Sequence, residues 1–258
     1  MLDMIFVTGD IHSKPNRFSA DIFYEQKEMT KEDYLIILGD FGLVLESDSE
    51  SRTEKYWLDW LEKKPFTTLF VDGNHENFDR LDTYPVEEWN GGKVHKLRPS
   101  VIHLMRGQVF TLQNRTFFTF GGASSHDISD GILELDDPNL KLKIKRLDRE
   151  GRDDYRIHHY NWWERELPNE TEKNEGLENL KKCGYKVDYI LTHSPSTSLL
   201  TKMKDGNSEY HSDCLTDYLQ QILNMVEYRC FLFGHMHQNQ SFPEEKAYCL
   251  YEQIVRIL

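Results

Sequence analysis

Short apolar runs separated by polar stretches dominate the pattern of this chain. Runs of about five apolar, β-branched or aromatic residues bounded by Gly or Asp are typical of strands buried on both faces. Helical patterns lie between several of the runs, which predicts an α/β fold with a mainly parallel central sheet. The runs in question are Met4–Thr8, Tyr34–Leu38, Thr67–Val71, Val187–Leu191 and Cys230–Phe233.

Further strands are expected in the middle and at the end of the chain. Asn114–Arg115 separates Val109–Leu112 from Thr116–Phe120. Asn suits a tight turn, so these two segments predict a hairpin. Ala247–Leu250 and Gln253–Leu258 alternate well enough to form two closing strands, with a second hairpin as one arrangement. Antiparallel additions of this kind predict a mixed sheet arrangement.

Polar motifs follow the apolar runs closely, and each lies near a glycine. In sheets of this kind the ligand crevice lies beyond the carboxyl ends of the strands. Because side chains alternate in an extended chain, Asp10 and His12 are expected to project to one side, as are His235 and His237. The glycines allow the backbone to approach a ligand closely. The motifs are Gly9-Asp10-Ile11-His12, Gly39-Asp40, Gly73-Asn74-His75-Glu76, Thr192-His193 and Gly234-His235-Met236-His237.

The ordered motif set resembles that of calcineurin-like metallophosphoesterases, in particular bacterial and phage-type members. Oxygen and nitrogen ligands without thiolate fit Mn, Fe or Zn. The resemblance implies a four-layer α/β/β/α sandwich with mixed sheets, and two divalent metal ions, with Mn favoured. One ion would be held by Asp10, His12 and His237, the other by Asn74, His193 and His235, and Asp40 would bridge them.

The chemistry expected of such a centre is hydrolysis at phosphorus. Two divalent ions about 3.5 to 4 Å apart clamp the attacking and leaving oxygens and lower the pKa of bound water to near 7. Asp40 would hold the ions at that separation, and the neutral side chain of Asn74 would leave the cluster net positive. His75 is the best candidate to stabilise the transition state or protonate the leaving oxygen. The catalytic candidates are therefore His75 and Asp40.

One motif departs from the pattern of many family members. Where those members carry G-D-x-x-D, this chain has Leu43 in the place of the second acid. His75 therefore either lacks the carboxylate that orients it or takes Glu76 or another acid. The difference weighs against assignment as a protein serine/threonine phosphatase.

The most irregular region is expected to be an insertion or cap at about 124–186 within one domain spanning 1–258. We expect it to lie beside the metal site and to determine substrate choice. The Gly-rich stretch Gly121–Asp127, where the insertion begins, resembles one in some family members, so His126 either faces the site or belongs to a simple turn. Trp162 and Trp163 are candidates for stacking on a base, although at adjacent positions at least one is expected to pack internally.

Two further features of the insertion concern its charge and its helix. The basic segment Lys141–Arg146 is a candidate for contacting phosphate, but a solvated face is the favoured reading. A helix is expected over Thr171–Lys182.

Composition and charge narrow the class of protein. With 38% hydrophobic and 29% charged residues, the 258-residue chain is expected to be soluble and globular. Its net charge of −13 disfavours nonspecific binding to a nucleic-acid backbone, although a metal cluster still allows a nucleotide. No apolar run approaches the roughly 20 residues that span a bilayer. The beginning of the chain lacks a basic segment, so we expect no signal peptide, no membrane partner and a cytoplasmic location.

The four cysteines form no C-x-x-C pair, and free thiols are expected. The sequence thus predicts a phosphoesterase that hydrolyses a small phosphomonoester or phosphodiester, with nucleotides among the candidates, through a hydroxide activated by two metals. Two alternatives stay open: a dinuclear hydrolase of a non-phosphate ester or amide, and a weakly catalytic scaffold that binds a partner. Oligomeric state is left open.

Overall fold

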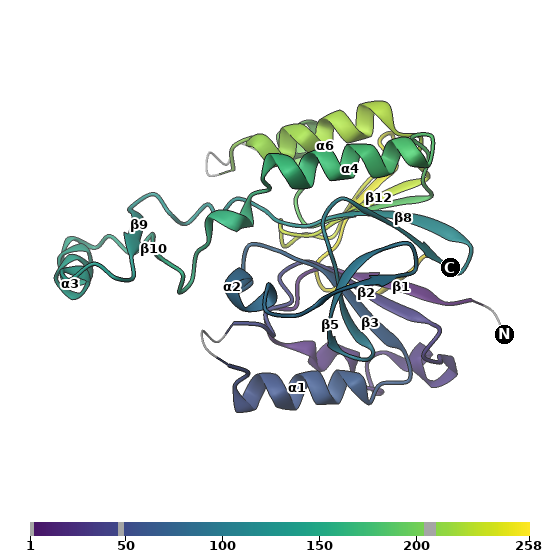
Figure 1. Cartoon of the computed structure of the whole chain (residues 1–258), viewed down its shortest axis with the longest axis horizontal. Coiled ribbons are helices and arrows are strands. Elements are labelled where there is room, and N and C mark those ends of the chain that lie inside the picture. The colour runs from purple at the N-terminus through teal and green to yellow at the C-terminus, as the bar shows by residue number, and fades with distance from the viewer. Residues whose placement is uncertain (1–2, 46–48, 204–209) are drawn as a thin grey trace.

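The computed structural model describes residues 3–45, 49–203 and 210–258. Two β-sheets face each other, and helices cover the outer face of each, so that the molecule has four layers (Figure 1). Both sheets mix parallel and antiparallel pairs. The predicted α/β/β/α sandwich with mixed sheets is confirmed.

The first sheet has the strand order β15-β1-β2-β3-β6-β5-β4. Its centre is parallel, since β1, β2, β3 and β6 run in one direction. At the two sides of the sheet the pairs are antiparallel: β15 with β1, β5 with β6 and β4 with β5. The strands are β1 Ile5–Thr8, β2 Tyr34–Leu38, β3 Thr67–Val71, β4 Val86–Trp89, β5 Gly92–Arg98, β6 Val101–Leu104 and β15 Val255–Arg256.

The second sheet has the order β13-β14-β12-β11-β8-β7. Its four inner strands are parallel, and β13 and β7 are antiparallel edges. The strands are β7 Gln108–Leu112, β8 Arg115–Phe120, β11 Tyr189–Thr192, β12 Cys230–Phe233, β13 Gln240–Phe242 and β14 Ala247–Cys249.

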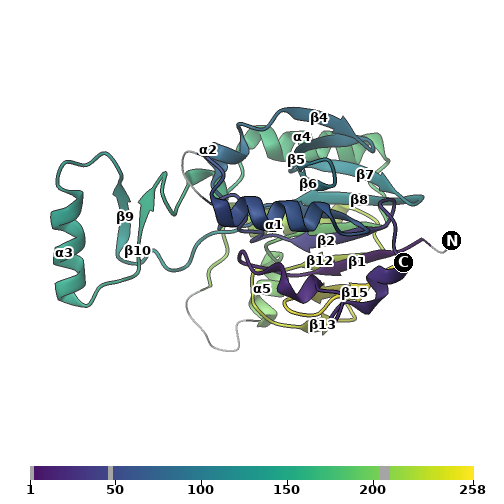
Figure 2. The same ribbon diagram turned by 90° about the horizontal axis from the view of Figure 1, so that it is seen from below.

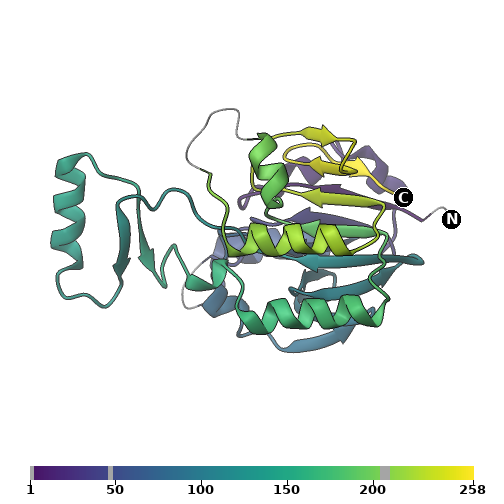
Figure 3. The same ribbon diagram turned by 90° about the horizontal axis from the view of Figure 1, so that it is seen from above.

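Helices cover the outer faces of the two sheets (Figures 1 and 3). Helix α1 packs on the first sheet, and α4 and α6 lie over the second. Capping boxes at Ser51, Asn169 and Asp213 fix where α1, α4 and α6 begin, because the side chain of each satisfies free backbone N–H groups. The helices of the sandwich are α1 Arg52–Glu62, α2 Phe78–Leu81, α4 Glu170–Lys182, α5 Thr197–Met203 and α6 Cys214–Met225; short 3₁₀ helices span Pro15–Phe18, Tyr24–Glu28 and Glu164–Glu166.

The apolar runs supply two cores at once because side chains of a strand alternate between its faces. On β1, Ile5 and Val7 face the second sheet, whereas Phe6 packs in the cluster under α1. Burial of each such side chain stabilises the fold by about 1.5 to 3 kcal/mol relative to exposure. The strands are therefore held from both sides, and their carboxyl ends are fixed in place.

The hairpin expected around residue 114 is present as β7 and β8, with its loop one residue earlier in the chain than expected. Leu112 pairs with Arg115, so the two loop residues are Gln113 and Asn114, with φ of 47° and 58°. Two left-handed residues in a two-residue loop match the twist of the flanking strands.

The prediction of a hairpin between the two closing strands, Ala247–Leu250 and Gln253–Leu258, is wrong. β14 pairs with β12 and β13 in the second sheet, while β15 pairs with β1 in the first. The chain crosses from one sheet to the other after Leu250, which is buried between the sheets. Alternation identified the two strands but not their partners, because parallel pairing with β12 buries β14 equally well.

Residues 131–158 form an arm that extends away from the sandwich (Figures 1 and 2). It consists of β9 Gly131–Glu134, α3 Leu140–Glu150 and β10 Tyr155–His158, with β9 and β10 parallel. The basic segment Lys141–Arg146 lies in α3. The helix expected at 171–182 is present as α4, but it belongs to the sandwich rather than to the arm. The range 124–186 therefore contains two structurally different parts.

Two other findings concern membranes and thiols. In the described part of the chain no helix is both long and apolar enough to cross a bilayer. All four cysteines, at 183, 214, 230 and 249, are free.

Candidate metal centre

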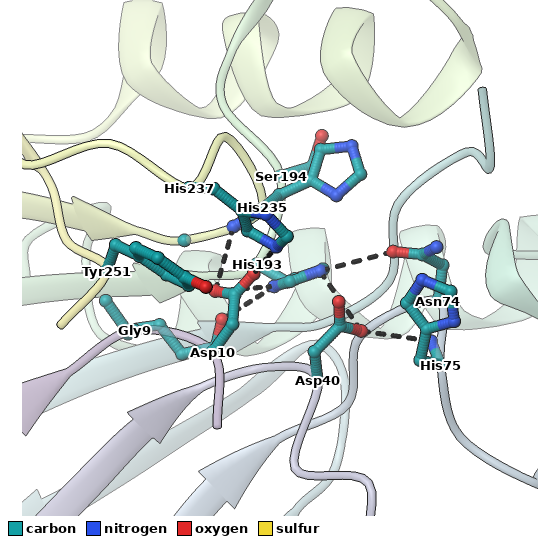
Figure 4. A network of polar contacts seen from close by, with 12 residues as sticks. Gly9, Asp10, Asp40, Asn74, His75, His193, Ser194, His235, His237 and Tyr251 are labelled. Carbon is teal, nitrogen blue, oxygen red and sulfur yellow. Dashed lines mark hydrogen bonds and ion pairs between the residues drawn. The ribbon is translucent and has the colours of Figure 1, made fainter. Parts of the chain in front are cut away.

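Loops that follow β1, β2, β3, β11 and β12 meet at one end of the sandwich and bring together the side chains singled out in the sequence (Figure 4). Asp10 and Asp40 come from loops of the first sheet, and His193 and His235 from loops of the second. The parallel direction of these strands causes the convergence, because their carboxyl ends share an edge.

Four side chains form one tight group of candidate ligands. One ligand atom from each of Asp10, His12, Asp40 and His237 lies within 4.8 Å of the others. His12 Nε2 lies 2.9 Å from His237 Nε2, which in turn is 3.1 Å from Asp10 Oδ2. Asp10 Oδ2 is buried and has no hydrogen-bond partner of good geometry. A buried carboxylate oxygen and two facing imidazoles match the donor set preferred by a divalent transition metal.

A second group lies on the other side of Asp40. Asp40 Oδ1 is 3.4 Å from His193 Nε2, and His193 Nε2 is 3.3 Å from Asn74 Oδ1. The His235 ring lies 5.0 Å from the His193 ring. His193 Nδ1 donates to the carbonyl of Leu38 at 2.7 Å, which orients the ring and directs Nε2 at Asp40 and Asn74.

Asp40 lies between the two groups. Its Oδ2 is 3.7 Å from His12 Nε2, whereas its Oδ1 faces His193 and accepts the backbone N–H of His75 at 3.0 Å. Burial by itself would raise the pKa of the Asp40 carboxyl, but His193, His75 and His12 hold it below its usual range. The carboxylate is therefore ionised and presents one oxygen to each group.

The pKa values of the two buried imidazoles, His193 and His235, are shifted in opposite directions. Burial, reinforced by His193, lowers the pKa of His235 to about 3, so this ring is neutral and has a free lone pair. Burial also lowers the pKa of His193, but Asp40 and Asp10 outweigh it and raise the pKa to about 10. The carboxylates thus favour a positive charge at His193, which a bound metal ion would supply in place of the proton.

The backbone of the ligand loops differs from the sequence expectation. Extended geometry was expected to align Asp10 with His12 and His235 with His237, but these residues lie in loops beyond the strands. His12, His235 and His237 have φ of 42°, 64° and 49°, in the left-handed region. Such conformations cost about 1 to 3 kcal/mol each and persist where the surroundings impose them. Alternation in a strand is therefore not what brings the ligands together.

Two glycines permit close approach within the site. A Cβ on Gly73 would lie 2.0 Å from Asp40 Oδ1, and a Cβ on Gly39 would lie 2.2 Å from His193 Nδ1. Gly39 also has φ of 89°, which side-chain-bearing residues rarely adopt. These positions accept only glycine if the carboxylate and the imidazole are to stay where they are.

A buried chain of hydrogen bonds that the sequence did not reveal holds Asn74. Asn74 Nδ2 donates to Ser125 Oγ at 3.2 Å, and Ser125 Oγ donates to Glu166 Oε2 at 2.7 Å. Glu166 also accepts from the backbone of Ser125 and from Trp162 Nε1, both at 2.9 Å. Burial raises the pKa of Glu166 to about 7, even though these donors oppose the shift. Ser125 lies in the Gly-rich stretch singled out earlier, which was the only available signal.

Other bracing residues also escaped the sequence reasoning. The guanidinium of Arg17 donates to the carbonyls of Gly9, Asp10 and Tyr251 and so clamps the first ligand loop to the end of the chain. The Tyr251 ring stacks on His237 at 4.6 Å. Neither residue lies in one of the sequence motifs. Their partners are backbone groups or side chains of distant loops, which the sequence pattern does not reveal.

His75 lies at the rim of the first group, with its ring 5.5 Å from that of His12. Within residues 3–45, 49–203 and 210–258, no carboxylate forms a hydrogen bond or ion pair with its imidazole. Glu76 instead accepts the backbone N–H groups of Phe41 and Gly42 at 2.7 and 3.1 Å. Leu43, at the position of the missing acid, is buried in the core.

The residues expected on the substrate side lie in different surroundings. The His126 ring is 6.0 Å from the His235 ring and lines a cavity beside it. Trp163 is buried and donates to Asp79 Oδ2 at 2.7 Å, and Trp162 donates to Glu166. Both indole N–H groups are thus occupied, and neither tryptophan lines that cavity.

Most of the chain matches a known protein family. A family profile described as calcineurin-like phosphoesterase matches residues 4–239. Among curated proteins no match is found. Among solved structures, the phosphopantetheinyl hydrolase from Mycobacterium tuberculosis aligns over 96% of this chain and 88% of its own, with 13% identity and a TM-score of 0.48.

Proposed function

The chain belongs to the calcineurin-like phosphoesterase family, and on that premise we propose that it hydrolyses a phosphomonoester or phosphodiester with the help of two divalent metal ions. The observation that carries the proposal is the position of Asp40, whose two oxygens face two separate groups of candidate ligands. A single-metal site would not need a buried carboxylate arranged in this way.

The donor sets fit two ions. Asp10, His12 and His237 would hold one and Asn74, His193 and His235 the other, with Asp40 shared between them. When bound, the ions would neutralise charge on the phosphoryl oxygens and make water a better nucleophile. We favour Mn over Fe and Zn for this set of oxygen and nitrogen ligands, and nucleotides are among the small substrates to be tested.

The remaining work falls to groups of the protein. His75 lies at the rim of the ligand cluster, where its imidazole is placed to donate a hydrogen bond to a phosphoryl oxygen or a proton to the leaving oxygen. Its backbone N–H is bound to Asp40, which ties the position of the ring to that of the shared carboxylate. Removing such a group typically slows a reaction by about 100-fold or more.

The test is turnover of p-nitrophenyl phosphate and bis(p-nitrophenyl) phosphate by metal-stripped protein reconstituted with Mn. We expect activity that depends on the metal and that Asp40→Asn abolishes, because the amide cannot serve two ions with two charged oxygens. Metal content measured by elemental analysis should fall in the same variant. Asp21→Asn, which alters an exposed carboxylate, is the matched control.

The results distinguish the three functions considered. Full activity in Asp40→Asn contradicts the mechanism. Turnover of p-nitrophenyl acetate, with neither phosphate ester cleaved, points to a hydrolase of other esters. Protein that binds little metal and cleaves none of these compounds points to a scaffold.

A further inference from the structure

A cavity of about 600 Å³ opens beside the Asn74, His193 and His235 half of the candidate centre. His235 lines it directly, together with Ser194, which follows His193, and Ser125, which binds Asn74. A volume of this order suits a small organic ligand, since such pockets measure about 300 to 1,000 Å³. A phosphate ester bound at the centre therefore has room for its organic group on this side.

The described walls of the cavity carry acceptors, hydroxyls and rings, but no lysine or arginine. Serine hydroxyls and carboxylates accept hydrogen bonds from hydroxyl and amine groups. The His126 and Tyr210 rings are 4.8 Å apart, and each lies about 6 Å from the His235 ring, at 6.0 and 6.1 Å. This wall offers aromatic surface for a ring of the ligand.

The carboxylates of the cavity differ in how far they are already satisfied. Asp127 forms an ion pair with Arg156, and Asp213 caps helix α6 through two backbone N–H groups. Asp154, just before β10, is exposed and accepts from Ser129 Oγ at 3.2 Å. Asp154 thus keeps acceptor capacity and negative charge toward the cavity.

We propose that this cavity is the leaving-group site and selects phosphate esters of alcohols that carry no second anionic group and are rich in hydroxyl or amine groups. The inference rests on the proposed function. In hydrolysis the phosphorus–oxygen ester bond breaks, water supplies the new oxygen to phosphorus and a proton to the departing alcohol, and the alcohol is then released from the cavity. A leaving group that carries another phosphate meets Asp154, and none of the described lining residues is a lysine or an arginine that would balance the charge. Like charges brought together at a binding site weaken binding, so discrimination of about tenfold or more is expected.

The experiment compares matched substrates with the metal-loaded enzyme. Fructose 6-phosphate and fructose 1,6-bisphosphate differ by one phosphate on the leaving group, and adenosine 5′-monophosphate and adenosine 3′,5′-bisphosphate provide a second pair of esters. We expect kcat/KM to favour the first member of each pair by about tenfold or more. The monophosphate with the higher kcat/KM shows whether the site prefers a sugar or a nucleoside. Equal or better turnover of the bisphosphate overturns the proposal.

A charge reversal tests the wall itself. Asp154→Lys should reduce the preference by about tenfold, whereas Asp153→Lys makes the same charge change at an exposed neighbour that does not line the cavity. If both variants shift the ratio equally, the effect is one of overall charge and the leaving-group assignment is wrong. Asp154→Asn replaces the lysine variant if that protein does not fold, and it should shift the ratio in the same direction.

A binding measurement separates this inference from the proposed function. Saturation-transfer NMR with adenosine and with methyl glucoside detects occupancy of the cavity without turnover. At least one probe should bind the wild type and lose binding in Tyr210→Ala. If no phosphate ester is cleaved but this pattern holds, the proposed function fails and the leaving-group role fails with it, although the cavity still binds a neutral polar ligand. If neither probe binds, the cavity assignment fails whatever the activity.

Discussion

The ligand loops and the arm are parts of one chain, but the surrounding structure holds them in very different ways. Asp10, Asp40 and His193 are at most 1% exposed, and each has contacts to more than one loop. In the arm, α3 buries only Leu147 among its described residues, while Leu142 is 67% exposed. Ion pairs such as Arg152–Asp130 and Lys143–Asp137 lie on the surface of the arm.

The comparison shows how chemistry and selectivity are separated. The ligand loops are fixed by both sheets, so a change in the arm need not move them. The root of the arm contributes Ser129 and Asp154 to the cavity, so the same change can alter what fits there. Ser125 and Glu166, which precede and follow the arm in the chain, bond to each other and, through Asn74, to a ligand loop. Variants in each region and at their junction can test this division.

A matched pair of glycine substitutions should show the largest difference. Gly73→Ala places a Cβ 2.0 Å from Asp40 Oδ1, so Asp40 must move. Because misplacement by about 1 Å can cost roughly 100-fold in rate, we expect turnover to fall at least that far, with loss of bound metal. Gly151→Ala, at the end of α3, meets no atom within 4 Å but has φ of 68°.

The arm variant should lose about 1 kcal/mol of unfolding free energy from the left-handed backbone and keep its activity. Elemental analysis, turnover and thermal unfolding of both variants provide the measurements. Normal metal content and turnover in Gly73→Ala would show that the ligand loop is far more adaptable than its packing indicates.

At the junction, Glu166 should make stability depend on pH. Its pKa is raised from 4.5 to about 7 in the folded protein, chiefly by burial. The unfolded chain therefore loses this proton at lower pH than the folded chain, and stability falls as pH rises from about 4.5 to 7. At 1.36 kcal/mol per pH unit, the expected contribution is about 3 kcal/mol.

Glu166→Gln should remove this slope, since the amide does not titrate in that range. Denaturant unfolding of both proteins at several pH values between 4.5 and 8 measures the difference. Parallel curves for the two proteins would mean that the pKa of Glu166 is the same in the folded and the unfolded chain.

Ser125→Ala should have the smallest effect of the three. It removes the hydroxyl that accepts from Asn74, so the amide loses its orienting partner. Loss of a residue that orients a metal ligand typically weakens metal affinity by about 10 to 100-fold. Titration with Mn followed by calorimetry measures this, and Ser241→Ala at an exposed position of β13 is the control. Unchanged affinity would limit the hydrogen-bond chain to a role in folding.

The sequence predicted the parts of the molecule in which local pattern decides structure. The runs Tyr34–Leu38 and Thr67–Val71 coincide with β2 and β3, because strands buried on both faces need continuous apolar residues. The order of the motifs predicted which side chains would meet. What pattern could not supply was the partner of β14 or the left-handed backbone at His12, since both depend on tertiary packing.

Residues that act through backbone atoms or through single long-range contacts were also beyond reach. Arg17 and Glu166 occur in unremarkable sequence contexts, and their partners come from distant parts of the chain. The arm was expected only as an irregular insertion. Its separation from α4 became visible only when α4 was found packed on the second sheet.

The distance along the chain between ligands has a consequence for folding. His12 and His237 are 225 residues apart in sequence, yet their Nε2 atoms lie 2.9 Å apart. Contacts of such high sequence separation close large loops and form slowly. The first ligand group can therefore assemble only after the strands of both sheets have come together. In a refolding experiment, tight metal uptake should be among the last events, so a bound metal would serve as a reporter that the chain has completed its fold.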